Sequence, residues 1–255
     1  MNSEIIAVGT ELLHGDIANT NAQYISKELA KIGIDVHYHT VVGDNEKRIL
    51  NVFEIASKRA DIIICTGGLG PTKDDITKEI LAKFLDIPMI FDEFSKNHIE
   101  YIFKSRNRIM TDNNLRQAYF PEGSKVLKNE NGTANACILE KDGKVFILLP
   151  GPPREVQPLV QDSVLPYLTK FSEEVVECIK IKVQNLGEST AETLIMDLID
   201  NQTNPTIAPY AGNGRVVFRV TAKASSQEEA LAKIEPLVKE MLRRFGDNAS
   251  ILEEE

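Results

Sequence analysis

Glycines, hydroxyl groups and acids are concentrated in one short stretch, residues 65–77, which reads CTGGLGPTKDDIT and follows an apolar run. Gly67, Gly68 and Gly70 allow positive φ angles and a close approach of the backbone to a ligand. A glycine-rich loop between a strand and a helix directs backbone N–H groups at an anion near the helix N-terminus. This stretch therefore predicts a site for a phosphate group.

Two adjacent acids, Asp74 and Asp75, follow the glycines, at the point where we expect a helix to begin near Asp74. Neighbouring carboxylates repel each other unless a cation bridges them, and hard divalent ions such as Mg²⁺ prefer oxygen ligands. A phosphate, paired carboxylates and Mg²⁺ together are a usual way of holding a nucleotide polyphosphate. We therefore expect a divalent metal, with Mg²⁺ as the first candidate, beside the phosphate site.

A simpler interpretation explains part of the loop. Thr72 and Asp75 approximate a capping box, and acids in a first helical turn are ordinary helix electrostatics. That interpretation leaves the three glycines at positions 67, 68 and 70 unexplained. The spacing matches neither a Walker A loop nor the G-x-G-x-x-G fingerprint, because Lys73 occupies the last glycine position. Anion binding is favoured over plain capping.

Other polar loops follow the first two expected strands, within GTELLHGDIANTN (residues 9–21) and VVGDN (residues 41–45). Their polar side chains include Thr10, Glu11, Asp16, Asn19, Thr20, Asn21 and Asp44. Ligands of open parallel sheets bind outside the carboxyl ends of the strands, so we expect these loops along one edge with residues 65–77. The alternative for Asn19 or Thr20 is a helix N-cap.

A fourth loop, LLPGPPREV, spans residues 148–156. Gly151 and the proline pair predict a rigid turn, and Arg154 has the geometry to bind a phosphate with two hydrogen bonds. A proline-rich first turn of a helix explains the same residues equally well.

Alternating elements must hold these loops. Apolar or β-branched runs predict strands at 4–8, 34–42 and 60–66, and apolar periodicity predicts helices at 20–32 and 46–59. This order predicts an α/β fold with a three-layer parallel sheet. Beyond about residue 170 the pattern becomes strand, helix, two strands and helix, which predicts a small α+β domain. We expect domains at 1–170 and 171–255, and we expect Phe91, Phe94 and Tyr101 in the core.

Composition excludes several classes of protein. The 255 residues carry a net charge of −9, and both halves are acidic, so we expect no nucleic-acid partner. No apolar run is long enough to span a membrane, and the N-terminus lacks a basic signal region. The three cysteines form no CxxC pair, so we expect reduced thiols in the cytoplasm. RNA binding by a KH-like second domain fits poorly, because NPTIAPYAGNGRV is not a GXXG clamp.

The motifs together resemble those of CinA-type competence/damage-inducible proteins. GTELLHGDIANTNAQYIS, VVGDN, TGGLGPTKDDIT, GTANACIL and LPGPPREV occur in that family's order, and the resemblance covers roughly residues 3–250. It implies a molybdopterin-binding-like domain similar to MogA, MoaB and MoeA over 1–170, a KH-like βαββα domain over 171–255, and a homodimer. The family usually has Pro-Gly after Gly-Thr-Ala, where this chain has Asn135 and Ala136.

The resemblance also implies an activity: metal-dependent hydrolysis of ADP-ribose to AMP and ribose 5-phosphate. Many relatives add a nicotinamide mononucleotide deamidase domain with a Ser-Cys-Thr-Gly-Gly stretch. That stretch does not occur in this sequence, so we expect no deamidase here. The expected partner is a small nucleotide of the ADP-ribose type.

We assign roles to the loop residues on this hypothesis. The predicted metal ligands are Asp74, Asp75 and Asp44, and the predicted catalytic residues are Asp74, Asp75, Lys73 and Glu11. A metal-bound water attacks one phosphorus, and Lys73 or Arg154 stabilises the developing charge. The predicted substrate-binding residues are Thr10, Asn19, Asn21, Asp44, Gly67, Gly68, Gly70, Thr72, Gly151 and Arg154.

Two rival functions stay open. One is a protein of molybdenum cofactor metabolism that binds or adenylylates molybdopterin, because that fold carries a similar Gly-Gly-x-Gly loop. The other is a non-catalytic nucleotide-binding module linked to competence or DNA damage. Both adjacent acids and all the loop glycines are present, which favours an enzyme.

Overall fold

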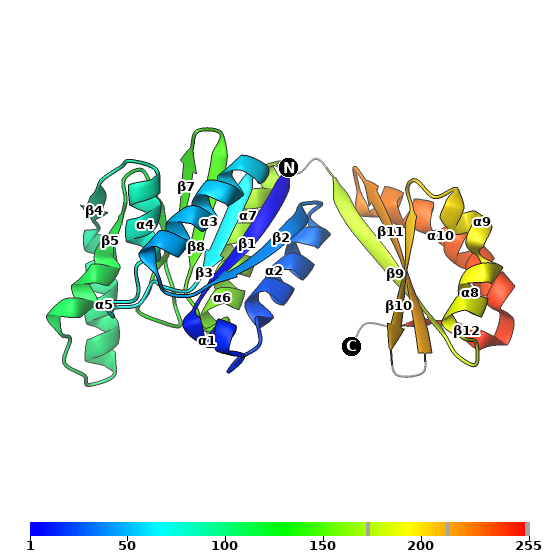
Figure 1. Cartoon of the computed structure of the whole chain (residues 1–255), viewed down its shortest axis with the longest axis horizontal. Helices are drawn as coiled ribbons and strands as arrows, with labels where there is room; N and C mark the ends of the chain where they lie inside the picture. Colours follow the sequence, from blue (N-terminus) through cyan, green and yellow to red (C-terminus); the bar gives the residue numbers. More distant parts are fainter. Residues whose placement is uncertain (172–173, 213–214, 253–255) are drawn as a thin grey trace. The chain divides into compact units, whose positions relative to one another are not determined.

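The structure is a computed structural model that describes residues 1–171, 174–212 and 215–252. Its chain divides into two compact units (Figure 1). Unit 1 comprises Met1–Ala30 and Ile34–Phe171, and unit 2 comprises Lys31–Gly33 and residues 172–255. Each unit has its own buried core.

A six-stranded sheet forms the centre of unit 1, in the order β2-β1-β3-β8-β7-β6. Its strands are β1 (Asn2–Val8), β2 (Asp35–Val42), β3 (Ile62–Thr66), β6 (Lys125–Leu127), β7 (Ala136–Lys141) and β8 (Lys144–Leu149). The first four in that order are parallel, whereas β7 and β6 are antiparallel to their neighbours. The α/β fold class is confirmed, and the sheet is mixed because a short turn joins β7 to β8 and can only link antiparallel strands.

Helices cover both faces of this sheet (Figure 1). The helices of unit 1 are α1 (Thr10–His14), α2 (Thr20–Lys31), α3 (Glu46–Arg59), α4 (Thr77–Phe84), α5 (Glu93–Ser105), α6 (Pro153–Leu159) and α7 (Leu165–Leu168). Further helical turns of other types are η1 (Asp112–Ala118), η2 (Val160–Val164) and η3 (Thr169–Phe171). Consecutive residues Ile62, Ile63 and Ile64 of β3 are all fully buried. Because neighbouring residues of a strand face opposite sides, both faces of the sheet must be covered.

The predicted start of the helix near Asp74 is wrong, because α4 begins at Thr77. Thr72 and Asp75 instead close a turn of their own, in which Asp75 Oδ2 accepts hydrogen bonds from the Thr72 amide and hydroxyl at 2.9 and 2.6 Å. The Thr77 amide then donates to the Gly68 carbonyl at 3.1 Å. The acids therefore lie in a ten-residue loop, residues 67–76, ahead of the helix.

The prediction that Phe91, Phe94 and Tyr101 lie in the core is also wrong, because their exposed fractions are 37%, 52% and 70%. Phe91 belongs to a separate two-stranded sheet of β4 (Met89–Phe91) and β5 (Tyr119–Pro121). Helix α5 buries Ser95, His98, Ile99 and Ile102, so Phe94 and Tyr101 lie beside that face. The spacing is helical, but the apolar stripe lies elsewhere on the helix.

Unit 2 contains an antiparallel sheet in the order β10-β11-β9-β12. Its elements are β9 (Val175–Val183), α8 (Glu188–Leu194), α9 (Met196–Asp200), β10 (Thr206–Gly212), β11 (Arg215–Ala224), α10 (Gln227–Phe245), η4 (Gly246–Asn248) and β12 (Ala249–Leu252). The small α+β domain is confirmed, with the first of its two expected helices split into α8 and α9 and with one further strand, β12. Phe218 of β11 stacks on Phe245 of α10 at 5.4 Å in its core. None of the described helices combines the length and apolar character needed to cross a bilayer.

Candidate active site

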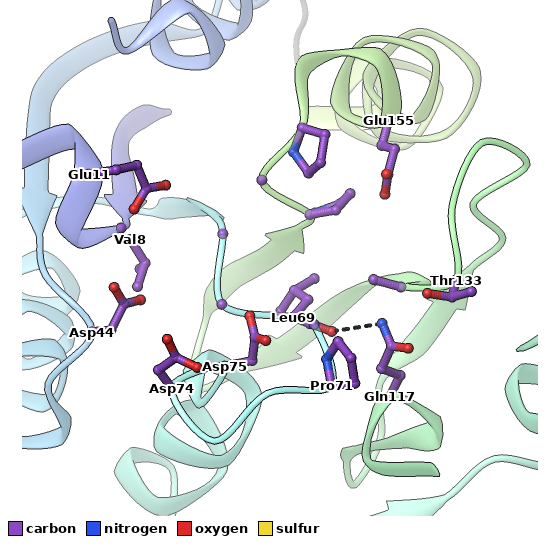
Figure 2. Close-up of a pocket in the computed structure, with 18 residues that line it drawn as sticks. Val8, Glu11, Asp44, Leu69, Pro71, Asp74, Asp75, Gln117, Thr133 and Glu155 are labelled. Atoms are coloured by element: carbon purple, nitrogen blue, oxygen red, sulfur yellow. Dashed lines mark hydrogen bonds between the residues drawn. The ribbon is translucent and has the colours of Figure 1, made fainter. Parts of the chain in front are cut away.

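A cleft of about 360 Å³ lies where β1, β3 and β8 end, and residues from several loops line it (Figure 2). Its walls come from the loop after β1, the loop after β2 at Asp44, the 67–75 loop and the Pro150–Pro152 turn. The structure thus brings together the four loops that the sequence singled out. Parallel strands with the same direction deliver their following loops to a single edge of the sheet.

Five carboxylates line this cleft: Glu11, Asp44, Asp74, Asp75 and Glu155 (Figure 2). No lysine or arginine is among the residues of the described chain that line it. The local charge is therefore strongly negative. An anionic ligand would bind here only together with cations or against backbone N–H groups.

The Asp44 carboxylate is fixed by Thr10, which does not itself line the cleft. The Thr10 amide and hydroxyl donate to Asp44 Oδ2 at 2.9 and 2.8 Å. Glu11 folds back over the backbone of Gly9, where an added Cβ would lie 2.7 Å from Glu11 Oε1. The sharp turn after β1 therefore places one acid in the cleft directly and holds another in place.

Asp74 and Asp75 are held by Thr72, which is exposed and lies outside the lining. Its hydroxyl contacts Asp74 Oδ1 and Asp75 Oδ2. The hydrogen bond from Thr72 lowers the pKa of the Asp74 carboxyl. A lowered pKa keeps the Asp74 carboxyl ionised, which suits cation binding.

The glycines of the 67–75 loop are required by packing within the chain itself. Gly67 and Gly68 have φ angles of +97° and +69°, and an added Cβ would lie 2.1 Å from the Val8 carbonyl oxygen and 2.1 Å from Thr77 Oγ1, respectively. At Gly70 it would lie 2.4 Å from Asp75 Oδ2. The glycine pattern that suggested a ligand thus has a second cause in the close contact of this loop with its neighbours.

A second cavity of about 280 Å³ adjoins the first and shares Val8, Glu11, Gly151 and Pro152 with it. Its other walls are mostly apolar, with the two predicted amide side chains, Asn19 and Asn21, among them. Asn21 Nδ2 donates to the Gly151 carbonyl at 2.7 Å, which ties α2 to the Pro150–Pro152 turn.

Asn19 Oδ1 accepts from the Ala22 amide at 3.1 Å, so Asn19 serves as a helix cap as well as a wall residue.

The two predicted cationic residues lie outside both cavities. Lys73 is exposed, and the Arg154 side chain is 79% exposed with its Nε 4.0 Å from Glu155 Oε1. Gly151 lines both cavities through its backbone. The described structure therefore brings no predicted cation to the acidic cleft.

Glu155 is a cleft residue that the sequence analysis missed, although it lies within the quoted LPGPPREV motif. Its side chain is 10% exposed, and Oε2 accepts from Asn129 Nδ2 at 2.7 Å. Asn129 is in turn held by Asn135, whose Oδ1 accepts from the Asn129 amide at 2.9 Å and whose Nδ2 donates to Ser95 Oγ at 2.9 Å. Asn135 thus supports the Glu155 carboxylate indirectly, through Asn129.

A second group of missed residues comes from η1. Arg116 donates to the carbonyls of Thr72 and Asp75, and its guanidinium lies 3.0 Å from Glu79 Oε1. Gln117 lines the cleft and donates to the Leu69 carbonyl at 3.4 Å. These residues lie about 40 positions after the loop that they hold, and nothing in their own stretch of sequence signals the contact.

The donor set fits a divalent ion that arrives with its ligand better than a preformed metal cage. Among the described residues, no group of three or more His, Cys, Asp or Glu is close enough to hold a metal by itself. The hydrogen bonds of Asp44, Asp74 and Asp75 each engage a single carboxylate oxygen, which leaves the other for a cation. Mg²⁺ in nucleotide sites usually has one or two carboxylates, waters and substrate phosphates as ligands.

Comparison with known families agrees with this architecture. Residues 4–170 match the family model described as a probable molybdopterin binding domain, and residues 180–249 match the KH domain of damage-inducible protein CinA. The fold and cleft define a protein that joins a molybdopterin-binding-type α/β domain to a KH domain.

The chain belongs to the CinA-type competence-damage inducible family. It is 53% identical over 254 residues to a putative competence-damage inducible protein of Clostridium beijerinckii and 51% identical over 247 residues to a CinA-like protein of Dictyoglomus turgidum. It covers 62% and 60% of their lengths. The crystal structure of CinA from Thermoplasma acidophilum, a protein of unknown function, is similar over 64% of this chain and 96% of its own, with 34% identity and a TM-score of 0.60.

Proposed function

We propose that unit 1 hydrolyses the pyrophosphate bond of a small nucleotide in a metal-dependent reaction, with ADP-ribose as substrate and AMP and ribose 5-phosphate as products. One observation carries the proposal: five carboxylates and a glycine-rich loop share one cleft whose described lining contains no lysine or arginine. Such a cleft suits a polyphosphate that binds with divalent cations, and it suits no bare anion.

The carboxylates of the cleft would have two roles, metal binding and proton transfer. Asp44, Asp74 and Asp75 would each offer a carboxylate oxygen that lies outside their hydrogen bonds, and one or two of them would hold Mg²⁺ together with the phosphates of the ligand. When bound, the ion supplies charge neutralisation at the pyrophosphate and acidifies a coordinated water. Glu11 and Glu155 supply two further carboxylates that can accept the proton of an attacking water.

The adjoining cavity supports a nucleotide over a simple polyphosphate. Its walls combine apolar side chains with the amides of Asn19 and Asn21, which is the mixture that binds a flat heteroaromatic ring and its polar edge. Because the two cavities share walls, one ligand can reach both: the ring in the smaller cavity and the phosphates in the acidic cleft.

The test is hydrolysis of ADP-ribose by the full chain with Mg²⁺, with and without EDTA. We expect AMP release that EDTA abolishes and that Asp75→Asn reduces at least about 100-fold. Asp162→Asn, at an exposed acid elsewhere in the same unit, is the matched control and should leave the rate unchanged. Well-folded protein that releases no AMP with Mg²⁺, Mn²⁺ or Co²⁺ would disprove the hydrolase.

A second candidate, binding of a phosphorylated pterin, is favoured by the family model that matches residues 4–170. A pterin is also a flat ring with polar edges, so it fits the same two cavities. Calorimetric titration with a pterin phosphate and with AMP separates the two functions. Tighter binding of the pterin by more than tenfold, without AMP release from ADP-ribose, would replace the first proposal with the second.

A further inference from the structure

The amides of the glycine loop are oriented by one residue, Thr77, at the start of α4. Its hydroxyl donates to the Gly67 carbonyl at 2.9 Å, and its amide donates to the Gly68 carbonyl at 3.1 Å. In a planar trans peptide the C=O of one residue and the N–H of the next point in opposite directions. The N–H groups of Gly68 and Leu69 therefore point away from Thr77.

These two amides are available to a ligand. Gly68 and Leu69 line the cleft, whereas Thr77 is fully buried and does not line it. Within residues 1–171, 174–212 and 215–252, no hydrogen bond uses the N–H of Gly68 or Leu69. Two successive amides that point away from their own anchored carbonyls make an anion-binding concavity.

Gln117 gives an independent sign of a ligand beside these amides. Its side chain is 2% exposed and lines the cleft (Figure 2). Its Nε2 faces the Leu69 carbonyl, which fixes the orientation of the amide group. Its Oε1 is buried without a hydrogen-bond partner in the described chain. A buried acceptor of this kind is unfavourable unless a donor from a ligand or water meets it.

We propose that the amides of Gly68 and Leu69 bind the phosphate of a sugar phosphate, that Thr77 is the positioning residue for them, and that Gln117 Oε1 accepts a hydrogen bond from a sugar hydroxyl. This inference rests on the proposed function, because it names the part of the ligand that lies against the loop. The acidic side of the cleft is then left for the cation and the second phosphate.

The experiment measures binding of ribose 5-phosphate and of inorganic phosphate to the full chain with Mg²⁺ by calorimetry. Thr77→Val keeps the side-chain shape and removes the hydroxyl, and we expect its Kd for both ligands to rise about tenfold. Thr77→Ser keeps the hydroxyl and should stay within twofold of the wild type. Thr169→Val removes a comparable bond to the Leu165 carbonyl at 2.8 Å, far from the loop in sequence, and serves as the control.

Gln117→Met tests whether Gln117 Oε1 accepts a hydrogen bond from a sugar hydroxyl. This variant tests the inference even if Thr77→Val does not fold. We expect its Kd for ribose 5-phosphate to rise about tenfold while its Kd for inorganic phosphate stays within twofold. Unchanged affinity in folded Thr77→Val, or an unchanged ratio of the two Kd values in Gln117→Met, overturns the inference. Failure of the wild type to bind either ligand instead overturns the proposed function on which it rests.

Discussion

Lys78 is a cationic side chain that the fold buries directly behind the acidic loop. It is 3% exposed, its Nζ donates to the Gln117 carbonyl at 2.9 Å, and it lies 4.2 Å from the centre of the Phe120 ring. Burial lowers the pKa of Lys78 from 10.5 to about 8. Between those two values the folded protein has released a proton that the unfolded chain still holds, so Lys78 makes the protein more stable as pH rises.

A pH series on Lys78→Met tests this. From pH 7 to pH 10 the free energy of unfolding of the wild type should rise relative to the variant by on the order of 2 kcal/mol. The measurement is urea unfolding at each pH, with Lys83→Met, at an exposed lysine of the same helix, as the control for loss of a positive charge. If the free energy of unfolding of the wild type, relative to that of Lys78→Met, stays constant or falls as pH rises, the burial of Lys78 in its charged form is contradicted.

Gly67 should be intolerant of any side chain because its neighbour is backbone that cannot move aside. An alanine Cβ would lie 2.1 Å from the Val8 carbonyl oxygen at a φ of +97°. We expect Gly67→Ala to lower the free energy of unfolding by more than about 2 kcal/mol. Gly143→Ala has a similar φ of +73° with nothing within 4 Å, and it should lose only about 1 kcal/mol. If thermal melts show the same loss of stability for Gly67→Ala and Gly143→Ala, the positive φ angle alone sets the cost and the contact with the Val8 carbonyl adds nothing.

At the scale of elements, η1 clamps the acidic loop from outside the sheet. Arg116 reaches the carbonyls of Thr72 and Asp75 and the carboxylate of Glu79, while Asn113 Nδ2 donates to the Pro71 carbonyl at 3.4 Å. The guanidinium fork spans several acceptors at once, which an ammonium cannot do. The order of the loop therefore depends on η1, which is separated from it in the chain by α4, β4 and α5.

Arg116→Lys should loosen this loop without removing the charge. We expect the Kd of Mg²⁺-AMP to rise about tenfold, because Asp74 and Asp75 lose their fixed geometry, with a smaller effect on the melting temperature. Arg106→Lys, beyond the end of α5, is the matched substitution and should change neither quantity. Tight binding retained in Arg116→Lys would show that Thr72 alone fixes the acids.

At the scale of the whole molecule, the chain consists of two units with separate cores. Ile234 is fully buried in the core of unit 2, and the carboxylates of the cleft all belong to unit 1. Packing defects are felt mainly within the core that contains them. A substitution in the core of unit 2 should therefore lower the stability of that unit without changing ligand binding by unit 1.

Ile234→Ala provides that separation. We expect calorimetric unfolding to show a loss of about 2–5 kcal/mol confined to one of two transitions, while the Kd of Mg²⁺-AMP stays within twofold of the wild type. Ile64→Ala, in the core of unit 1, should instead move the other transition. A single transition shifted by both variants would mean that the units unfold as one.

The amino-acid sequence determined the strands at 4–8, 34–42 and 60–66, the helices at 20–32 and 46–59, and the loops that follow them. These depend on local patterns: wholly apolar runs for strands buried on both faces, and a 3.6-residue period for helices. The sequence also predicted that Asp44, Asp74 and Asp75 lie along one edge of the sheet, because their loops follow directly from those strands, and all three line the cleft.

Only the tertiary structure decided which side chains hold those loops in place and which line the cleft across from them. Arg116 and Gln117 reach the loop from positions whose own sequence signals nothing, because their contacts join segments that are far apart in the chain. Thr77 and Glu155 lie within two of the quoted motifs, but only the folded chain shows that Thr77 holds the glycine loop and that Glu155 lines the cleft. The predicted cations Lys73 and Arg154 lie outside the lining for the converse reason. Sequence proximity placed them beside the acids, but the direction of a side chain depends on backbone angles and on neighbours that only the folded chain supplies.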